Sequence, residues 1–365
     1  MKYGNYPHNP GHEGKGIKTR VQLHAGGPMR ECIEQTGRWA PAIYLGLFVV
    51  ATCIIIWSLH LLERKGLQGT MLGILCAPFC SALGNLIFVQ LMLQDPANGP
   101  LVLENVLLKN VTNLTVLLGL PALLWGMNVL DTAGAPPAKQ KKSSRQVDMA
   151  GAVVRIQRLS LLLSLFAALF FSAAVWVLGQ DGMLSRMDGL ILLGLFAFWQ
   201  VMHIWDVSKY AVAARFSMGP AILVDLGLLL VGGYLTYVST AWLVGWVMIL
   251  GQGFIGRDGL GWLSGWMMII PNVLLVVYYA ARGRADIAYG AQIGDGLICI
   301  PLCLGLFAVF HPVHMLGSSF TSLELILAAA FLHMTFLITL GRLPRWAGAA
   351  LTLAYGLFVY RSLLG

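Results

Sequence analysis

Two stretches of the sequence repeat one arrangement of residues, and this repetition constrains the fold more than any other feature. Ile270 to Gly305 reads IPNVLLVVYYAARGRADIAYGAQIGDGLICIPLCLG, two apolar segments joined by the basic hinge Arg282-Gly283-Arg284. A fainter copy, ALGNLIFVQLMLQDPANGPLVLENVLLKNVTNLTVLLG, runs from Ala82 to Gly119. Repeated pairs of hydrophobic segments that carry Gly and Asn are typical of internally duplicated membrane transporters, in which the site lies where the halves meet.

The fold class follows from how few charges the chain carries. Of its 365 residues, 58% are hydrophobic and only 11% are charged, whereas soluble domains carry about 25% charged residues. Apolar runs of roughly 20 residues cross a bilayer as helices. We therefore expect an all-α polytopic membrane protein with about ten transmembrane helices in two five-helix repeats. An odd number of spans in each repeat makes the two repeats inverted relative to one another.

Polar segments divide the chain into four parts. The expected parts are a polar N-terminal tail at 1–40, a first membrane repeat at 41–205, a connector at 206–218 and a second membrane repeat at 219–365. The first repeat is interrupted by a basic linker at 131–158, which we expect to be cytoplasmic. The histidines of the tail have no compact metal-ligand spacing, so a solvated tail or a docking arm is the preferred interpretation.

The distribution of Lys and Arg predicts the orientation in the membrane. Basic residues gather in alternate loops, including the linker and the hinge at Arg282 and Arg284, and such loops are cytoplasmic in polytopic proteins. The prediction is a multi-pass protein of a bacterial inner (plasma) membrane, with both termini on the non-cytoplasmic side. The tail, which holds six Lys or Arg residues, departs from this rule.

Several function classes are excluded by what the sequence lacks. It has no nucleotide-binding loop, no Ser/His/Asp arrangement and no haem-type Cys-x-x-Cys-His motif, so we expect no enzymatic activity and no cofactor. No stretch combines basic side chains with stacking aromatics, so the net charge of +8 does not indicate a nucleic-acid partner. Cys76/Cys80 and Cys299/Cys303 have i,i+4 spacing, which suits helix packing better than a soft-metal site.

The two repeats resemble a known family. IIPN in the second repeat is similar to the SLPE motif of the cation/Ca²⁺ exchanger superfamily. In the family a segment with a basic hinge and the pattern GNxIGSNIFNILLVLG follow this motif. Here AARGRADIAYGAQIGDGLICIPLCLG contains the hinge and runs without a gap onto that pattern, ending at Gly305. In the first repeat, ENVLLKNVTNLTVLLG from Glu104 to Gly119 is similar to the same pattern. ALGN matches SLPE there if one residue is inserted. The chain resembles the bacterial sodium/calcium exchanger-like branch, as a divergent member.

This resemblance implies a cation site at the middle of the membrane. In the family, the site is built from the Glu of each PE, the Ser of each GSN and the polar residue four positions later. A dehydrated Na⁺ or Ca²⁺ prefers several oxygen ligands, with carboxylates to balance its charge. In this chain the equivalents are Asn85 (Leu86 without the insertion) and Asn272 for the Glu, Lys109 and Asp295 for the Ser, and Asn113 and Cys299 for the last position.

Lys109 and Asp295 are the most informative of these replacements. They occupy equivalent positions of the two repeats, so an inverted arrangement brings them together near the midplane. A buried unpaired charge there costs several kcal/mol, and a pair costs less. We therefore expect an ion pair in the place of the transported cation. The alternative is that Lys109 extends along its helix to the membrane surface.

Two functions remain open. The first is a sodium/calcium exchanger-like transporter with an altered ion site, which does not exchange Ca²⁺; Glu104 and Asp225 are further candidates for proton or charge sites. The second is a non-transporting membrane scaffold that uses the same fold and docks other membrane or periplasmic subunits through residues 1–40. The only partner that both readings require is the lipid bilayer. Neither reading requires a resident metal.

Overall fold

The computed structural model describes residues 39–64, 77–129, 144–211, 221–249, 256 and 259–364. The tail expected at 1–40 therefore lies almost wholly outside the described residues, as do the first part of the basic linker, up to 143, and most of the connector. Residues 71–76, which include Cys76, lie outside them as well.

The described elements are helices joined by short turns. The first half contains α2 (Ala40–Arg64), α4 (Ala77–Met92), the 3₁₀ turn η3 (Pro96–Asn98), α5 (Gly99–Leu114), α6 (Val116–Trp125), β1 (Met127–Asn128), α7 (Ser144–Leu178), β2 (Met183–Leu184) and α8 (Arg186–Ala211). The second half contains α9 (Ala221–Ile249), α10 (Leu260–Ala281), α11 (Ala285–Ile298), the π-helical segment η4 (Cys299–Leu304), α12 (Gly305–Phe310), β3 (Val313–His314), α13 (Gly317–Thr339), β4 (Arg342–Leu343) and α14 (Arg345–Leu364).

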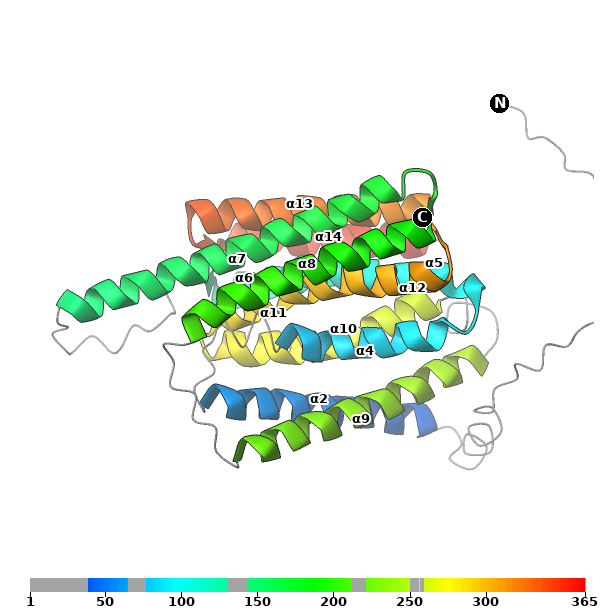
Figure 1. Cartoon of the computed structure of the whole chain (residues 1–365), viewed down its shortest axis with the longest axis horizontal. Helices are drawn as coiled ribbons and strands as arrows, with labels where there is room; N and C mark the ends of the chain where they lie inside the picture. The colour runs from blue at the N-terminus through cyan, green and yellow to red at the C-terminus, as the bar shows by residue number, and fades with distance from the viewer. Residues whose placement is uncertain are drawn as a thin grey trace, which may run out of the picture.

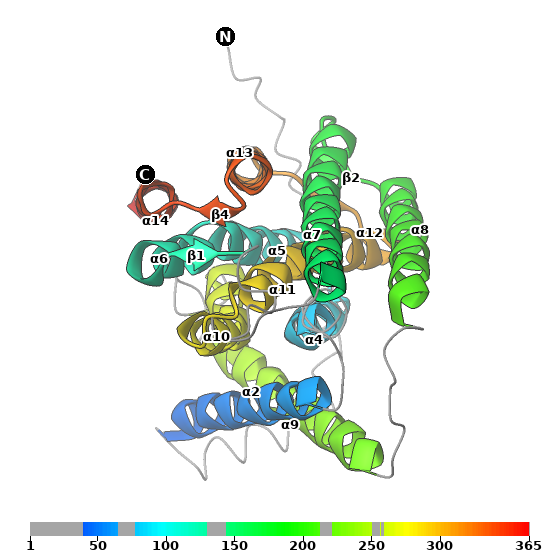
Figure 2. The same ribbon diagram turned by 90° about the vertical axis from the view of Figure 1, so that its left-hand side faces the viewer.

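The helices lie roughly along one direction, and α2 and α9 form a layer of their own beside the rest (Figure 1). Seen from the end of the bundle, α4, α5, α10 and α11 lie at the centre (Figure 2). The pair α6 and α14 lies on one side of this centre, α8 and α12 lie on the other, and α7 and α13 lie beyond it from α2 and α9 (Figure 2). The residues that resemble the family motifs are therefore on the innermost helices.

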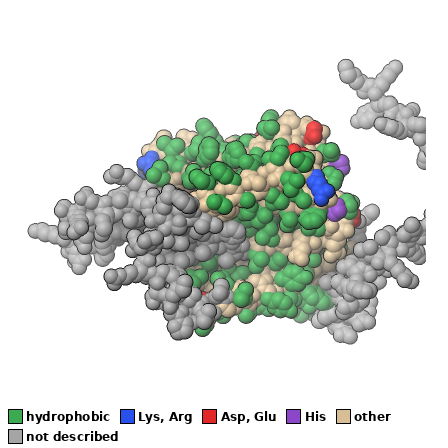
Figure 3. All heavy atoms as spheres, in the orientation of Figure 1, with side chains coloured by type: hydrophobic (Ala, Val, Ile, Leu, Met, Phe, Trp, Pro, Cys, Tyr) green, Lys and Arg blue, Asp and Glu red, His purple; other side chains and the backbone are tan. Residues whose placement is uncertain are grey.

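Length and hydropathy identify this bundle as a membrane protein. Among the described residues, seven helical stretches are long and apolar enough to cross a bilayer. The stretch Pro96–Trp125, which contains Lys109, is the most buried of them at 83%, whereas Ala40–Leu62 and Gly227–Met248 are only 33% buried. Hydrophobic side chains cover most of the visible coloured surface, and the few charges lie toward the ends of the helices (Figure 3). Apolar side chains that face outward are expected where lipid is the solvent.

Two of the apolar helical stretches are irregular in their middles. Pro96–Trp125 divides at Thr115, whose φ of −104° and ψ of −86° separate α5 from α6. Ala285–Phe310 stays helical but widens into η4, which contains Pro301. Proline removes a backbone donor and cannot fit a regular helix interior, and π-helical turns are common at functional sites.

Two helices extend into the polar intervals of the sequence. Helix α7 begins at Ser144, so the second part of the interval 131–158 is helical and continuous with the apolar stretch Arg158–Leu178. Helix α8 extends to Ala211, inside the interval 206–218. In both places charged residues interrupt the apolar pattern without a proline, and residues such as Lys and Arg are good helix formers.

Contacts between the halves follow a two-fold pattern. Strand β1 of the first half pairs with β4 of the second, and β2 of the first half pairs with β3 of the second, both antiparallel. Glycines make the matching close approaches: a Cβ on Gly348 would lie 2.5 Å from the carbonyl oxygen of Gly119, and one on Gly189 would lie 2.8 Å from that of Gly305. Exchanging each element for its counterpart in the other half reproduces the same contacts, which supports the expected repeat.

Candidate functional site

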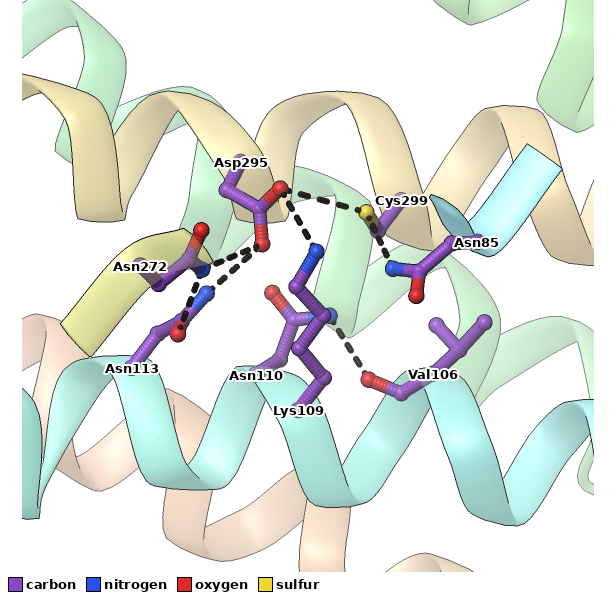
Figure 4. Close-up of polar contacts among 8 residues, drawn as sticks. All are labelled: Asn85, Val106, Lys109, Asn110, Asn113, Asn272, Asp295 and Cys299. Carbon is purple, nitrogen blue, oxygen red and sulfur yellow. Dashed lines mark hydrogen bonds and ion pairs between the residues drawn. The ribbon is translucent and has the colours of Figure 1, made fainter. Parts of the chain in front are cut away.

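Lys109 of α5 and Asp295 of α11 meet at the centre of the bundle. The ammonium Nζ of Lys109 lies 3.1 Å from Oδ1 of Asp295, and both side chains are 0% exposed (Figure 4). The expected contact is therefore present, and Lys109 does not extend to the membrane surface. Burial excludes the alternative because a lysine that reaches the interface keeps its charged end in water.

Amide groups complete the surroundings of the Asp295 carboxylate. Asn113, one turn after Lys109 on α5, donates from Nδ2 to Oδ2 of Asp295 at 2.7 Å. Asn272 of α10 donates to the same oxygen at 3.2 Å and to Oδ1 of Asn113 at 2.9 Å. Asp295 thus accepts hydrogen bonds at both carboxylate oxygens, from the ammonium at Oδ1 and from two amides at Oδ2.

Asn85 and Cys299 form the counterpart of this arrangement in the other half. Asn85 of α4 donates from Nδ2 to the sulfur of Cys299 at 2.9 Å, and the sulfur lies 3.5 Å from Oδ1 of Asp295. Asn272 contacts Asn113 in the equivalent way. The insertion in the first repeat, which gives Asn85 rather than Leu86 the Glu position, is therefore the alignment that agrees with the contacts.

Regular helix geometry explains why these side chains converge. Asn105, Lys109 and Asn113 recur every four residues, so they form one stripe along α5. Nδ2 of Asn105 donates to Oγ of Ser264 on α10 at 2.9 Å, which extends the stripe by one turn. All three stripe residues are 0% exposed. Polar side chains at this spacing must face other protein elements, because lipid offers no hydrogen bonds.

The charge of the cluster differs from that of a divalent-cation site. One ammonium and one carboxylate sum to zero, and the remaining members are neutral amides and a thiol. Ca²⁺ binds six to eight oxygens, usually including several carboxylates. Within the described part of the chain, no group of three or more His, Cys, Asp or Glu side chains is arranged to hold a metal ion. The described residues at the centre therefore lack the several carboxylates that a Ca²⁺ site usually contains.

The two further acidic candidates are not on the face that forms this cluster. Glu104 is half-buried on α5 and its side chain lies against Gly261 of α10, so a Cβ on that glycine would clash with it. Asp225 is 2% exposed on α9, in the layer that α9 forms with α2. Cys299 and Cys303 are both buried free thiols.

Two polar features near the central cluster are not predicted from the sequence: Asn110 on α5, and the contact between Tyr289 on α11 and His333 on α13. Asn110 is 1% exposed and directs its amide oxygen at Gly296 of α11, where a Cβ would lie 2.7 Å away. Tyr289 of α11 contacts His333 of α13 at 2.6 Å, and both are buried. A histidine within an apolar segment, as His333 is, indicates a buried polar contact. His333 lies outside the two repeated stretches, however, so spacing does not predict its partners.

Comparison with protein families agrees with this geometry. The family model for the sodium/calcium exchanger protein matches residues 39–205 and 224–364, which is most of the chain. The chain belongs to the sodium/calcium exchanger family. Each matched segment contains one irregular inner helical stretch and one member of the central ion pair, so the family match covers both members of the pair.

Solved structures share the exchanger fold. The sodium-calcium exchanger NCX_Mj soaked with 2.5 mM Na⁺ and 1 mM Sr²⁺ is similar with a TM-score of 0.66 and 16% identity, over 89% of this chain and 98% of that one. The same exchanger soaked with 10 mM Na⁺ and no Ca²⁺ gives a TM-score of 0.64 and 15% identity, over 89% and 99% of the two chains. The comparison with curated proteins gives no match. At this identity the likeness concerns the fold.

Proposed function

We propose that this member of the exchanger family is a secondary transporter in which the ammonium group of Lys109 stands in for a bound cation, and which does not exchange Ca²⁺. The observation that carries the proposal is the fully buried contact of 3.1 Å between Lys109 and Asp295. It lies at the positions where the family resemblance puts cation ligands. An ammonium tethered there supplies one positive charge at a fixed place and cannot leave.

Electrostatics explains why Na⁺ and Ca²⁺ are disfavoured. A free cation entering the cluster would meet the charge of Lys109 at close range, with Asp295 as the sole carboxylate among the proposed ligands. Like charges a few ångströms apart repel by about 4 kcal/mol even at the effective dielectric constant of a protein surface. The amides of Asn85 and Asn272 offer oxygens without the charge that would offset this repulsion.

The proton is the one cation that an ionisable side chain can carry by itself, so proton coupling would not require another ion to enter the cluster. We therefore propose the proton as the coupling ion, with an anion or a neutral solute as cargo. The orientation predicted from the basic loops, with both termini on the non-cytoplasmic side, stays part of this proposal.

Binding to purified protein tests the exclusion of Ca²⁺. We expect no change in the unfolding temperature of the wild-type protein when Ca²⁺ is added. The triple variant Asn85→Glu, Asn272→Glu and Lys109→Ser restores the residues of the family motif and should be stabilised by Ca²⁺, by about 2.7 kcal/mol at a concentration one hundred times its dissociation constant. The matched control keeps Lys109 and carries only the two Glu substitutions, which should bind much more weakly. Ca²⁺ stabilisation of the wild type would refute the proposal.

Proton movement tests the transport itself. In liposomes that contain a pH-sensitive dye, a pH gradient should drive proton flux through the wild-type protein. Lys109→Met should remove this flux, whereas Asp286→Asn, a change on the same helix as Asp295, should retain it. Under a Na⁺ gradient, uptake of radioactive Ca²⁺ should not exceed that of empty liposomes.

A non-transporting scaffold is the alternative function, and the pairing of the two central charges favours it. Asp295 has donors at both oxygens and Lys109 has its counter-ion, so neither charge needs a bound ion to balance it. On this alternative the protein would dock other subunits through the tail at 1–40. Absence of any proton or solute flux, together with recovery of a stable complex in mild detergent, would decide in favour of the scaffold.

A further inference from the structure

A buried histidine links three helices, two of which carry the central ion pair. The Nε2 atom of His333 on α13 lies 2.7 Å from the carbonyl oxygen of Leu114, the last residue of α5. Its Nδ1 atom lies 2.6 Å from the hydroxyl of Tyr289 on α11. The exposed fractions of His333 and Tyr289 are 0% and 1%. The side chain therefore joins α13 to both helices that carry the pair.

The chemistry of the partners fixes the roles of the two ring nitrogens. A backbone carbonyl can only accept, so Nε2 of His333 carries the hydrogen and donates to Leu114. In the neutral ring Nδ1 then accepts, and the hydroxyl of Tyr289 donates to it. Both contacts are thus directional, and each has one donor and one acceptor.

The carbonyl that His333 binds belongs to the break between α5 and α6. Carbonyl groups at a helix end lack partners within the helix, and in a membrane they cannot bind water instead. Leu114 directly follows Asn113, which donates to Asp295 at 2.7 Å. Holding the Leu114 carbonyl therefore holds the direction in which the Asn113 amide points.

The contact between His333 and Tyr289 restrains α11, the helix that carries Asp295. Tyr289 and Asp295 are both on α11, less than two turns apart. Since His333 also accepts from Tyr289, it fixes the position of α11 relative to the end of α5. The distance between Lys109 and Asp295 depends on this relative position.

The two halves differ in whether the outer helix beside the site carries a histidine. Helix α7 is the counterpart of α13 in the first half, and its sequence contains no histidine. The contact that His333 makes with the end of α5 therefore has no histidine counterpart on α7 for η4.

We propose that His333 is a positioning residue for the central site, which holds the α5–α6 break and α11 in the arrangement that keeps Asn113, Lys109 and Asp295 in contact. The proposal relies on the assignment of the central site, but its test does not require transport. It can therefore fail or succeed independently of the proposed function.

Cys299 offers a direct readout, because its buried sulfur lies 3.5 Å from Asp295. The full-length protein is treated with methyl methanethiosulfonate, and labelling of each cysteine is measured by mass spectrometry of its peptides. Cys53 is exposed and serves as the internal reference for reagent activity. Each variant is labelled well below its own unfolding midpoint, so that global unfolding does not contribute.

We expect His333→Phe to increase the labelling rate of Cys299 about tenfold, the change that loss of about one hydrogen bond would produce in a local opening equilibrium. Tyr289→Phe, which removes one hydroxyl, should give a smaller increase. His333→Gln should restore protection, because its amide nitrogen can reach the Leu114 carbonyl in place of Nε2. His333→Asn is too short to reach that carbonyl and should not restore it.

His311 provides the matched control. Its Nε2 lies 3.0 Å from the carbonyl oxygen of Leu93, so it makes a similar contact at the end of α12. His311→Phe should leave Cys299 protected. The proposal is overturned if His333→Phe leaves Cys299 as protected as in the wild type, if His311→Phe exposes it equally, or if His333→Asn protects it as well as His333→Gln.

Discussion

Removing one charge of the central pair should destabilise the protein strongly. Asp295→Asn keeps the size of the side chain but leaves the Lys109 ammonium, which is 0% exposed, without its counter-ion. Breaking a buried pair in this way costs about 3–5 kcal/mol, because an uncompensated charge stays in a medium of low dielectric constant. Asn113 and Asn272 would also lose the charged acceptor of their hydrogen bonds.

The double variant separates the pair from its individual charges. Lys109→Met combined with Asp295→Asn removes both charges, and replacing a buried pair by neutral side chains is often nearly neutral. We therefore expect the double variant to be more stable than either single variant, with a coupling energy of about 3 kcal/mol or more in the cycle. Equilibrium unfolding in mixed micelles with dodecyl sulfate, followed by tryptophan fluorescence, measures all four proteins.

Asp286→Asn is the control on the same helix. Asp286 pairs with Arg284 at 3.3 Å; the Asp286 side chain is 3% exposed but that of Arg284 is 36% exposed, so water partly screens the interaction. Its loss should cost less than the loss of the fully buried pair, about 1–2 kcal/mol. The reasoning is refuted if Asp295→Asn costs no more than Asp286→Asn, or if the effects of Lys109→Met and Asp295→Asn simply add.

Two further substitutions probe the packing and the site. Gly348→Ala should destabilise the protein by about 1–3 kcal/mol, because its Cβ would lie 2.5 Å from the Gly119 carbonyl oxygen and the backbone cannot move aside easily. Gly356→Ala is the control: a Cβ there has nothing within 4 Å, so this variant should be as stable as the wild type or more stable. Equal unfolding midpoints for the two variants would contradict this prediction. Asn85→Leu should cost about 1 kcal/mol through its lost contact with Cys299, and an unchanged free energy of unfolding would show that this contact does not matter.

The parts of the site that could be predicted share a physical cause. Lys109 and Asp295 stood out because a charge inside a membrane needs a partner, and the repeat placed each at the equivalent position of the other half. Asn113 and Asn272 followed from helical spacing and from the family resemblance. The roles of these residues in transport stay predictions, since geometry alone does not test them.

What could not be predicted depends on long-range contacts and on local backbone geometry. His333 lies in a span without any repeated motif, and its two partners come from other helices. The break at Thr115 has no proline at its centre, so its position could not be read from composition. Composition marks the interval 131–158 as polar but does not give the residue at which α7 begins, because charged residues also form helices readily.

The two antiparallel ribbons have a consequence for how the halves stay together. Each ribbon joins a strand of one half to a strand of the other, and they lie at opposite ends of the bundle. The peptide between α8 and α9 is therefore one of several attachments between the halves. A chain cut in that segment would still have backbone hydrogen bonds at both membrane faces and a buried ion pair at the middle to join the two fragments.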